Sequence, residues 1–203
     1  MTEKKKDNEE PADKTSETPS PAPEEEKKKR NIASWISTGL TIGLILLVFI
    51  PWEKFGGDNP SSNVLFLGRF HPMVLHMPIG FIFAVFILEV FSFFSRKSLL
   101  EQAAYILLWF STLTAWVAVF LGVFLSMSGG YGEELMSDHR WSGISVAVFC
   151  LWSLRLKIRM HRHNQPALML PYRVLLLFTV GLLGLAGHHG GSLTHGTDYL
   201  FKY

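Results

Sequence analysis

Histidine is the residue type in this sequence that is best suited to chemistry, and it is unevenly placed. The chain has 203 residues and eight histidines. Two lie in HPMVLHMPIG (71–80), one in DHRWSG (138–143) and three in GHHGGSLTHGTDYL (187–200). Neutral imidazoles ligate haem iron, zinc and copper. A group of these side chains would therefore form a cofactor or metal site.

Two kinds of site are compatible with these residues. Haem b needs two axial imidazoles from facing helices at similar depth, and His76, His139 and His188 meet that condition. A zinc or copper site needs three or four converging ligands, which the same histidines would supply together with His195 or Asp198. A HExxH motif is absent, so the sequence does not favour a zinc hydrolase. The choice between haem and metal stays open.

Five apolar segments are available to position these side chains. Most reach the ~20 residues that cross ~30 Å of hydrocarbon, and each must be helical because lipid cannot satisfy open backbone groups. They are Ile32–Pro51, Pro72–Phe94, Leu99–Ser126, Trp141–Leu156 and Leu170–His188. We therefore expect an all-α integral membrane protein with five transmembrane helices, of which the last four form an up-down four-helix bundle.

Composition and charge narrow the functional classes. Residues 1–30 are rich in Lys, Glu, Pro and Ser and lack aromatic residues, which predicts a disordered charged tail. The single cysteine, Cys150, excludes an intramolecular disulfide and a CxxCH haem attachment site. The basic stretches flank apolar segments or alternate with acidic runs, so we do not expect nucleic-acid binding. No pattern identifies a reaction, and we expect an electron-transfer or anchor subunit rather than an enzyme by itself.

Positive charge predicts the orientation in the membrane. With a cytoplasmic N-terminus, fifteen of the nineteen Lys and Arg residues lie on the cytoplasmic side. The C-terminus is then periplasmic, in the inner membrane of a bacterium. Six histidines fall at the outer face in this topology; they are His71, His76, His139, His188, His189 and His195.

Local signals suggest how the helices begin and end. Pro72 follows His71, as is typical of a helix start, and we expect His76 to be the inward-facing histidine of that helix. Asp138 is expected to cap the fourth span, which puts His139 in its first turn. Gly190 and Gly191 are expected to end the fifth span.

One acidic residue lies in the inner half of the second span. Glu89, in FILEVFSFF, must face the interior of the bundle or become neutral, because a charge in lipid is costly. We expect it to pair with Arg96 or Arg155 near the inner surface.

The histidine motifs resemble those of a known family. HPMVLHMPIG, DHRWSG and GHHGGSLTHGTDYL are similar in order and spacing to three signatures of a bacterial four-helix membrane domain of unknown function, family 2231. These signatures run approximately HPxxVHxPI, HRWxG and GHxGGSLxHGxDYL. The resemblance implies that His71, His76, His139, His188 and His195 are the family histidines, whereas His189 stands where an apolar residue is usual. It also implies an association with planctomycete-type cytochrome c proteins, in which such domains form the membrane module.

Together these observations predict three regions and two alternative functions. The regions are a tail at 1–30, an N-terminal transmembrane helix at 31–52 and a four-helix membrane domain with an outer-face histidine cluster at 65–200. The leading hypothesis is a haem b-binding electron-transfer subunit that exchanges electrons with a periplasmic c-type cytochrome or quinol. In it, two of His76, His139 and His188 ligate iron, while His71 and His195 support them. The alternative is a membrane anchor or assembly protein whose outer histidines bind Zn, Cu or a partner.

Overall fold

The described part of the chain is helical. The structure is a computed structural model that describes residues 42, 61–95, 98–163 and 165–199, and these contain helices and turns but no strand. The elements are α2 (Ser62–Gly68), α3 (His71–Phe94), α4 (Ser98–Ser126), α5 (Glu133–His163), the short 3-10 turn η2 (Pro166–Leu168) and α6 (Met169–His195). The tail expected at 1–30 and the helix expected at 31–52 lie outside the described residues, apart from Ile42.

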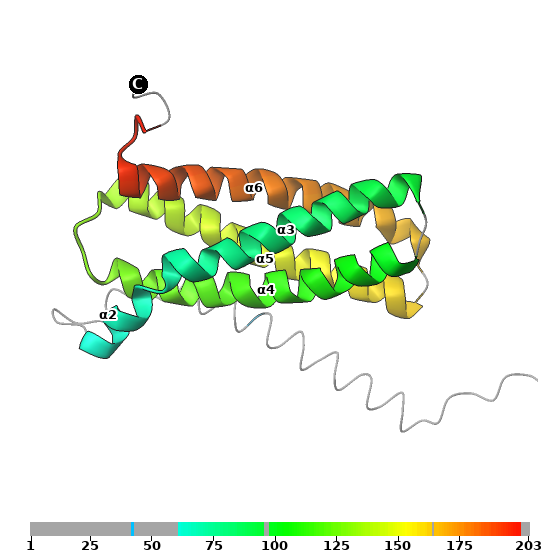
Figure 1. Cartoon of the computed structure of the whole chain (residues 1–203), viewed down its shortest axis with the longest axis horizontal. Helices are drawn as coiled ribbons and strands as arrows, with labels where there is room; N and C mark the ends of the chain where they lie inside the picture. The colour runs from blue at the N-terminus through cyan, green and yellow to red at the C-terminus, as the bar shows by residue number, and fades with distance from the viewer. Residues whose placement is uncertain (1–41, 43–60, 96–97, 164, 200–203) are drawn as a thin grey trace, which may run out of the picture. The chain divides into compact units, whose positions relative to one another are not determined.

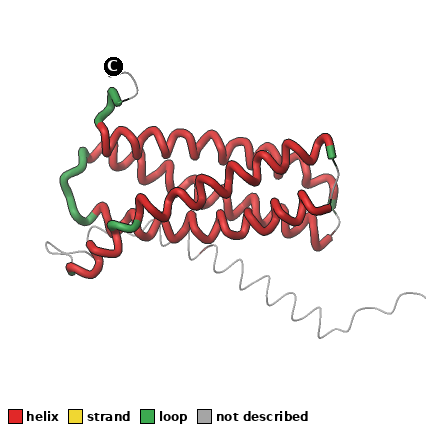
Figure 2. Tube along the Cα trace, viewed as in Figure 1, coloured by secondary structure: helices red, strands yellow, loops and turns green. Residues whose placement is uncertain are grey.

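Four of these helices are long and apolar enough to cross a membrane. Helices α3, α4, α5 and α6 have 24, 29, 31 and 27 residues, and about 20 suffice for the hydrocarbon core. Each packs against the next one in the chain, and α3 also touches α6 to a smaller extent (Figures 1 and 2). The start of α3, the end of α4, the start of α5 and the end of α6 therefore share one end of the assembly.

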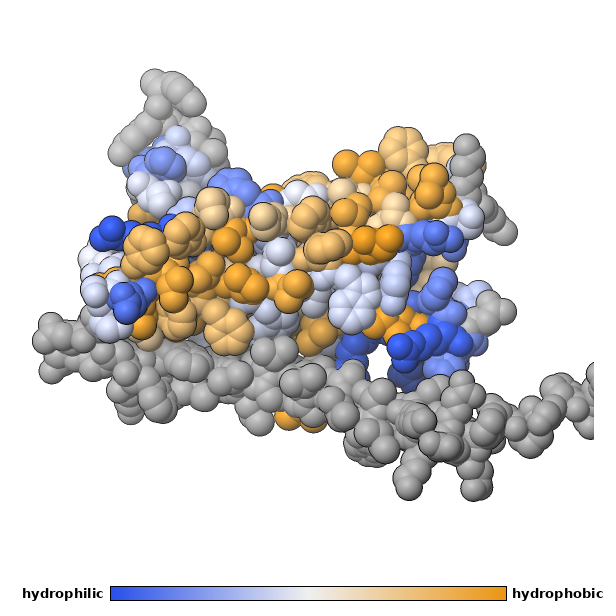
Figure 3. Space-filling model, turned by 60° about the horizontal axis from the view of Figure 1, so that its bottom comes forward, coloured by the Kyte–Doolittle hydropathy of each residue, from blue (hydrophilic) through white to orange (hydrophobic). Residues whose placement is uncertain are grey.

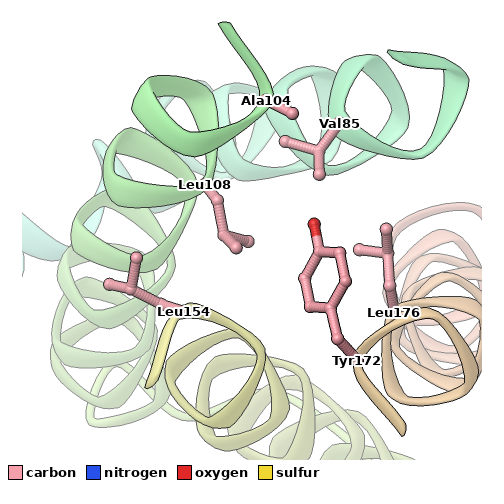
Figure 4. Close-up of a cluster of buried hydrophobic side chains, with 6 residues drawn as sticks. All are labelled: Val85, Ala104, Leu108, Leu154, Tyr172 and Leu176. Atoms are coloured by element: carbon pink, nitrogen blue, oxygen red, sulfur yellow. The ribbon is translucent and has the colours of Figure 1, made fainter. Parts of the chain in front are cut away.

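The interior holds two apolar clusters. The first is centred on Tyr172, whose side chain is fully buried and points from α6 toward α3 and α4 (Figure 4). It comprises Val85, Ala104, Leu108, Leu154, Tyr172 and Leu176. The second lies nearer the histidine motifs and comprises Ile82, Val146, Cys150, Leu183 and Ala186. All four long helices contribute to this interior.

The outward faces of the helices are as apolar as the interior. Large side chains that are about half exposed include Phe83, Ile87, Phe110, Leu113, Val174 and Leu177. Figure 3 shows apolar residues over the middle of the helices and hydrophilic ones gathered near the ends. In water such a surface would drive aggregation, whereas a bilayer solvates it. These faces therefore contact lipid.

Two helix ends differ from the sequence-based expectation. Helix α5 starts at Glu133, so Asp138 is not its cap and His139 lies beyond the first turn. Helix α6 runs through Gly190 and Gly191 to His195 and ends at Gly196, which has a positive φ of 89°. The backbone is helical at both glycines, so they do not end the helix. They allow close packing instead, because an added Cβ would crowd His139 at Gly190 and Tyr199 at Gly191.

A short helix that the sequence did not suggest precedes α3. Helix α2 packs against the end of α4 through Gly68, which is buried. A Cβ at Gly68 would lie 2.5 Å from the backbone nitrogen of Leu125, which only glycine avoids. This contact fixes the entry of the chain into α3 and so the position of His71.

At the far end of the helices, Glu89 is buried in a network of ion pairs. Its carboxylate accepts hydrogen bonds from Lys157 Nζ at 2.5 Å and Arg173 Nε at 3.4 Å. We expected Arg96 or Arg155 as the partner; Lys157 and Arg173 take that role, and Arg96 lies outside the described residues. Lys157 also lies over the ring of Tyr172, with Nζ 4.7 Å from its centroid. The network joins α3, α5 and α6.

We predict that Glu89→Leu lowers stability by roughly 3 kcal/mol or more, because it leaves Lys157 buried without its counter-charge. Thermal unfolding of the full chain in detergent, followed by tryptophan fluorescence, measures the effect. The double variant Glu89→Leu/Lys157→Leu should recover much of the loss. Glu101→Gln, at an exposed position in the first turn of α4, is the matched control. Wild-type stability of the single Glu89 variant would contradict this account.

Candidate functional site

A cavity of about 630 Å³ opens at the end of the helices that carries the histidine motifs. All four long helices line it, mostly with apolar side chains and glycines. Its polar lining consists of His71, His76, Ser126, Tyr131, His139, Arg140, Thr194 and His195. Ligand sites are commonly concave and largely apolar, with few polar groups that fix orientation. This cavity has that character.

His71 is held at the cavity by a hydrogen bond to another helix. Its Nδ1 lies 2.8 Å from the carbonyl oxygen of Ala118 on α4. A carbonyl only accepts, so Nδ1 carries the proton and Nε2 has the free lone pair. The ring lies over Gly122, where a Cβ would be 3.0 Å from the imidazole. Glycine at this position therefore makes room for the ring.

His139 repeats the same arrangement on the other pair of helices. Its Nδ1 lies 3.1 Å from the carbonyl oxygen of Ala186 on α6, so Nε2 again has the lone pair. Its ring lies over Gly190, where a Cβ would also be 3.0 Å from the imidazole. This packing explains why glycine occupies position 190 inside a continuous helix.

The two arrangements occupy equivalent positions in two helical hairpins. Both hydrogen bonds span 47 residues, and both glycines follow their alanine by four residues. His139 lies 68 residues after His71, and the same offset relates Ala186 to Ala118 and Gly190 to Gly122. The ion-paired Glu89 and Lys157 are also 68 residues apart. The hairpins α3–α4 and α5–α6 therefore repeat the same arrangement, and each contributes one imidazole to the cavity.

The two imidazoles lie next to each other in the cavity. Their ring centroids are 6.1 Å apart and their planes are nearly perpendicular, at 81°. Both rings are only half-buried, since each borders the open space. The site thus offers two neutral nitrogen ligands, each oriented by a backbone carbonyl from a neighbouring helix. Such a second hydrogen bond is the usual support of a metal-bound histidine.

Two other predicted site residues also line the cavity. His76 is exposed and His71 is half-buried, the reverse of the expectation that His76 faces inward. The reason is that His71 reaches across to α4, whereas His76 donates from Nδ1 to the carbonyl of Pro72 in its own helix, at 2.5 Å. His195 lines the cavity near the end of α6 and is exposed.

His188 lies outside the cavity lining. It is exposed and stacks against Tyr199, with centroids 6.1 Å apart. His189 adjoins it, and its Nδ1 is 3.4 Å from the hydroxyl of Ser142. His195 also contacts Tyr199, with ring centroids 6.0 Å apart. The hydroxyl of Tyr199 packs on Gly191, which borders the cavity.

The pairing of His71 with His139 escaped the sequence analysis. By depth along facing helices, His76, His139 and His188 were the expected ligands, and His71 was expected only to support them. The 68-residue offset between matching His, Ala and Gly positions was the available signal. In the described part of the chain, no group of three or more His, Cys, Asp or Glu side chains is arranged to hold a metal ion.

We predict that both rings are fixed as Nδ1–H tautomers and that Gly190→Ala disturbs only one of them. The added methyl group would press on His139 and displace its signals in ¹⁵N–¹H spectra of histidine-labelled protein, with little change for His71. Gly143→Ala is the control, because Gly143 lines the same cavity with nothing within 4 Å of the new methyl position. Equal perturbation by both variants would contradict the packing described here.

Comparison with known proteins identifies a family. The family described as "Predicted membrane protein (DUF2231)" matches residues 69–198, well over half of the chain, and this range includes the cavity and all six histidines near it. No curated protein and no solved structure matches the chain.

Proposed function

We propose that this chain, which belongs to the DUF2231 family of predicted membrane proteins, holds haem b between His71 and His139 and transfers electrons. When bound, haem b supplies one-electron chemistry, with a redox potential set by its axial ligands and surroundings. The observation that carries the proposal is the adjacent pair of imidazoles at one cavity, each with its Nδ1 bound to a carbonyl and its Nε2 left as the metal-binding nitrogen.

The spacing of the two rings supports this proposal. A bond from a metal to an imidazole nitrogen is about 2.0 Å, which puts the centroids of two opposed axial imidazoles roughly 6 Å apart. The observed separation of 6.1 Å agrees with that value. Two ligands complete an axial haem pair, whereas zinc and copper sites need three or four.

The walls of the cavity support it as well. Gly143 and Gly187 line the cavity with nothing within 4 Å of an added Cβ, so a flat macrocycle can approach the helix backbones closely at these two positions. The volume of about 630 Å³ lies in the range of cofactor sites, and the lining is mainly apolar. These properties suit a porphyrin better than a hydrated ion.

The proposal changes the roles assigned from the sequence. His71 replaces His76 and His188 as the expected partner of His139, because His188 lies outside the cavity lining and His76 is bonded within its own helix. His195 stays a supporting residue at the rim. The zinc or copper alternative has less support, since the described residues include no cluster of three ligands.

The setting that we propose follows the charge pattern. The four long helices form an up-down bundle in a bacterial inner membrane, with the N-terminus in the cytoplasm and the histidine end at the periplasmic face. A haem at that depth lies within reach of a soluble c-type cytochrome in the periplasm, which we propose as the electron acceptor.

The test is an absorbance spectrum of the full chain, purified in detergent from haem-replete cells. We predict a Soret band and, in the dithionite-reduced minus oxidised difference spectrum, an α band of bis-imidazole haem b. His71→Ala and His139→Ala should each reduce the bound haem at least tenfold, because each removes an axial ligand.

His188→Ala is the matched control and should retain wild-type haem content, because it removes an exposed histidine outside the cavity lining. Metal analysis on the same sample tests the alternative. Absence of both bands, or stoichiometric zinc or copper in place of iron, would overturn the haem proposal.

A further inference from the structure

We propose that this cavity also binds a lipid-soluble hydroquinone beside the haem, and that Nε2 of His76 accepts the hydrogen of its hydroxyl group. This inference rests on the proposed function, since the hydroquinone is the electron donor to that site. It assigns a role to the one residue of the HPMVLHMPIG motif whose imidazole the haem pair does not use.

His76 is placed to meet a molecule that arrives from the membrane. It lies five residues into α3, about 7.5 Å along the helix from His71, within a segment apolar enough to cross the bilayer. Its side chain is exposed and borders the cavity. An ionisable side chain inside a membrane span is costly unless it faces a partner or a cavity, and it marks a functional site by default.

The available nitrogen of His76 is a hydrogen-bond acceptor. Its Nδ1 donates to the carbonyl of Pro72, so Nε2 has the lone pair in the neutral ring. Among the described residues, this is the only hydrogen bond of the His76 side chain. The bond holds the ring to its own helix, in contrast to His71 and His139, which are tied to neighbouring helices. His76 is therefore an oriented base whose Nε2 has no hydrogen-bond partner among the described residues.

Two of the helices that line the cavity, α3 and α6, pack loosely against each other. Helices α3 and α6 touch much less than the sequential pairs do. On α6, Gly187 is exposed and a Cβ there would meet nothing within 4 Å. Gly187 and His76 both line the cavity, so its α3 and α6 walls combine a flat backbone surface with an imidazole base.

A hydroquinone fits these features better than other classes of electron donor do. A reductant that enters through the sides of membrane helices must dissolve in lipid, which excludes nucleotides and soluble proteins. A hydroquinone has a flat ring that can lie against a glycine wall and hydroxyl groups that donate to an imidazole. Its apolar tail would remain among the exposed apolar side chains of α3, such as Met73 and Met77.

The reaction balances with the groups already named. Oxidation of one hydroquinone to a quinone breaks two O–H bonds and releases two electrons and two protons. Haem b, held by His71 and His139, would supply the one-electron acceptor for both electrons, with the c-type cytochrome as the final oxidant. Each broken O–H bond is replaced by an N–H bond at Nε2 of His76. The imidazolium then returns its proton to water before the second transfer, in a cavity whose polar lining includes Tyr131, Arg140 and Thr194.

The kinetic test compares two reductants on the haem-loaded full chain. Decyl-ubiquinol and dithionite are mixed separately with the oxidised protein, and the growth of the α band is followed by stopped flow. We expect His76→Gln to slow reduction by decyl-ubiquinol at least tenfold, with the haem spectrum and the dithionite rate unchanged. His188→Gln, an exposed histidine outside the cavity lining, should match the wild type with both reductants.

A second test does not depend on haem. A photoreactive azidoquinone is cross-linked to the haem-loaded and haem-free protein, and the labelled peptides are identified by mass spectrometry. Labelling of α3 and α6 that decyl-ubiquinone competes away, and that His76→Gln weakens, supports the inference even if the spectrum has disproved the haem. Haem reduction by decyl-ubiquinol that is unaffected by His76→Gln, or labelling confined to other helices, would overturn it.

Discussion

In the hydrocarbon of a bilayer, a polar side chain must find its partner on another helix or in its own backbone, because no water is available. This constraint organises both ends of the protein. At one end, His71 and His139 donate to carbonyls of α4 and α6. At the other, Glu89 accepts from Lys157 and Arg173. The apolar contacts between these two ends are non-directional, so the polar contacts set the register of the helices.

The two hairpins meet this constraint in the same way, and the consequence is a shared site. Each hairpin places one imidazole against the carbonyl of its second helix and one glycine beneath the ring. Each hairpin contributes one such imidazole. Packing the hairpins together brings both rings to one cavity, so the tertiary contact that completes the fold also forms the cavity. The Glu89–Lys157 ion pair, at equivalent positions of the two hairpins, provides opposite charges where they meet.

The sequence allowed the class of protein and the location of the site to be predicted, but not the pairing within it. Apolar segments of about 20 residues identified the four long helices, because the bilayer imposes that length. Histidine-rich ends identified the region of the cavity. The predicted start of α5 and end of α6 were wrong because capping signals are local: α5 begins before Asp138, at Glu133, and Gly190 packs beneath the ring of His139 inside a continuous helix. The sequence also did not identify the partners of Glu89. Several cations lie at a similar depth, and their position in the chain does not show which of them contacts the carboxylate.

His71 and His76 are held differently because their backbone partners differ. Both have Nδ1 bound to a carbonyl, but one carbonyl belongs to α4 and the other to α3 itself. A ring tied to the second helix of its hairpin is held in place by both helices of that hairpin. A ring tied to its own helix keeps only its local orientation and its exposure. The first arrangement suits a permanently bound group, and the second suits a molecule that enters and leaves.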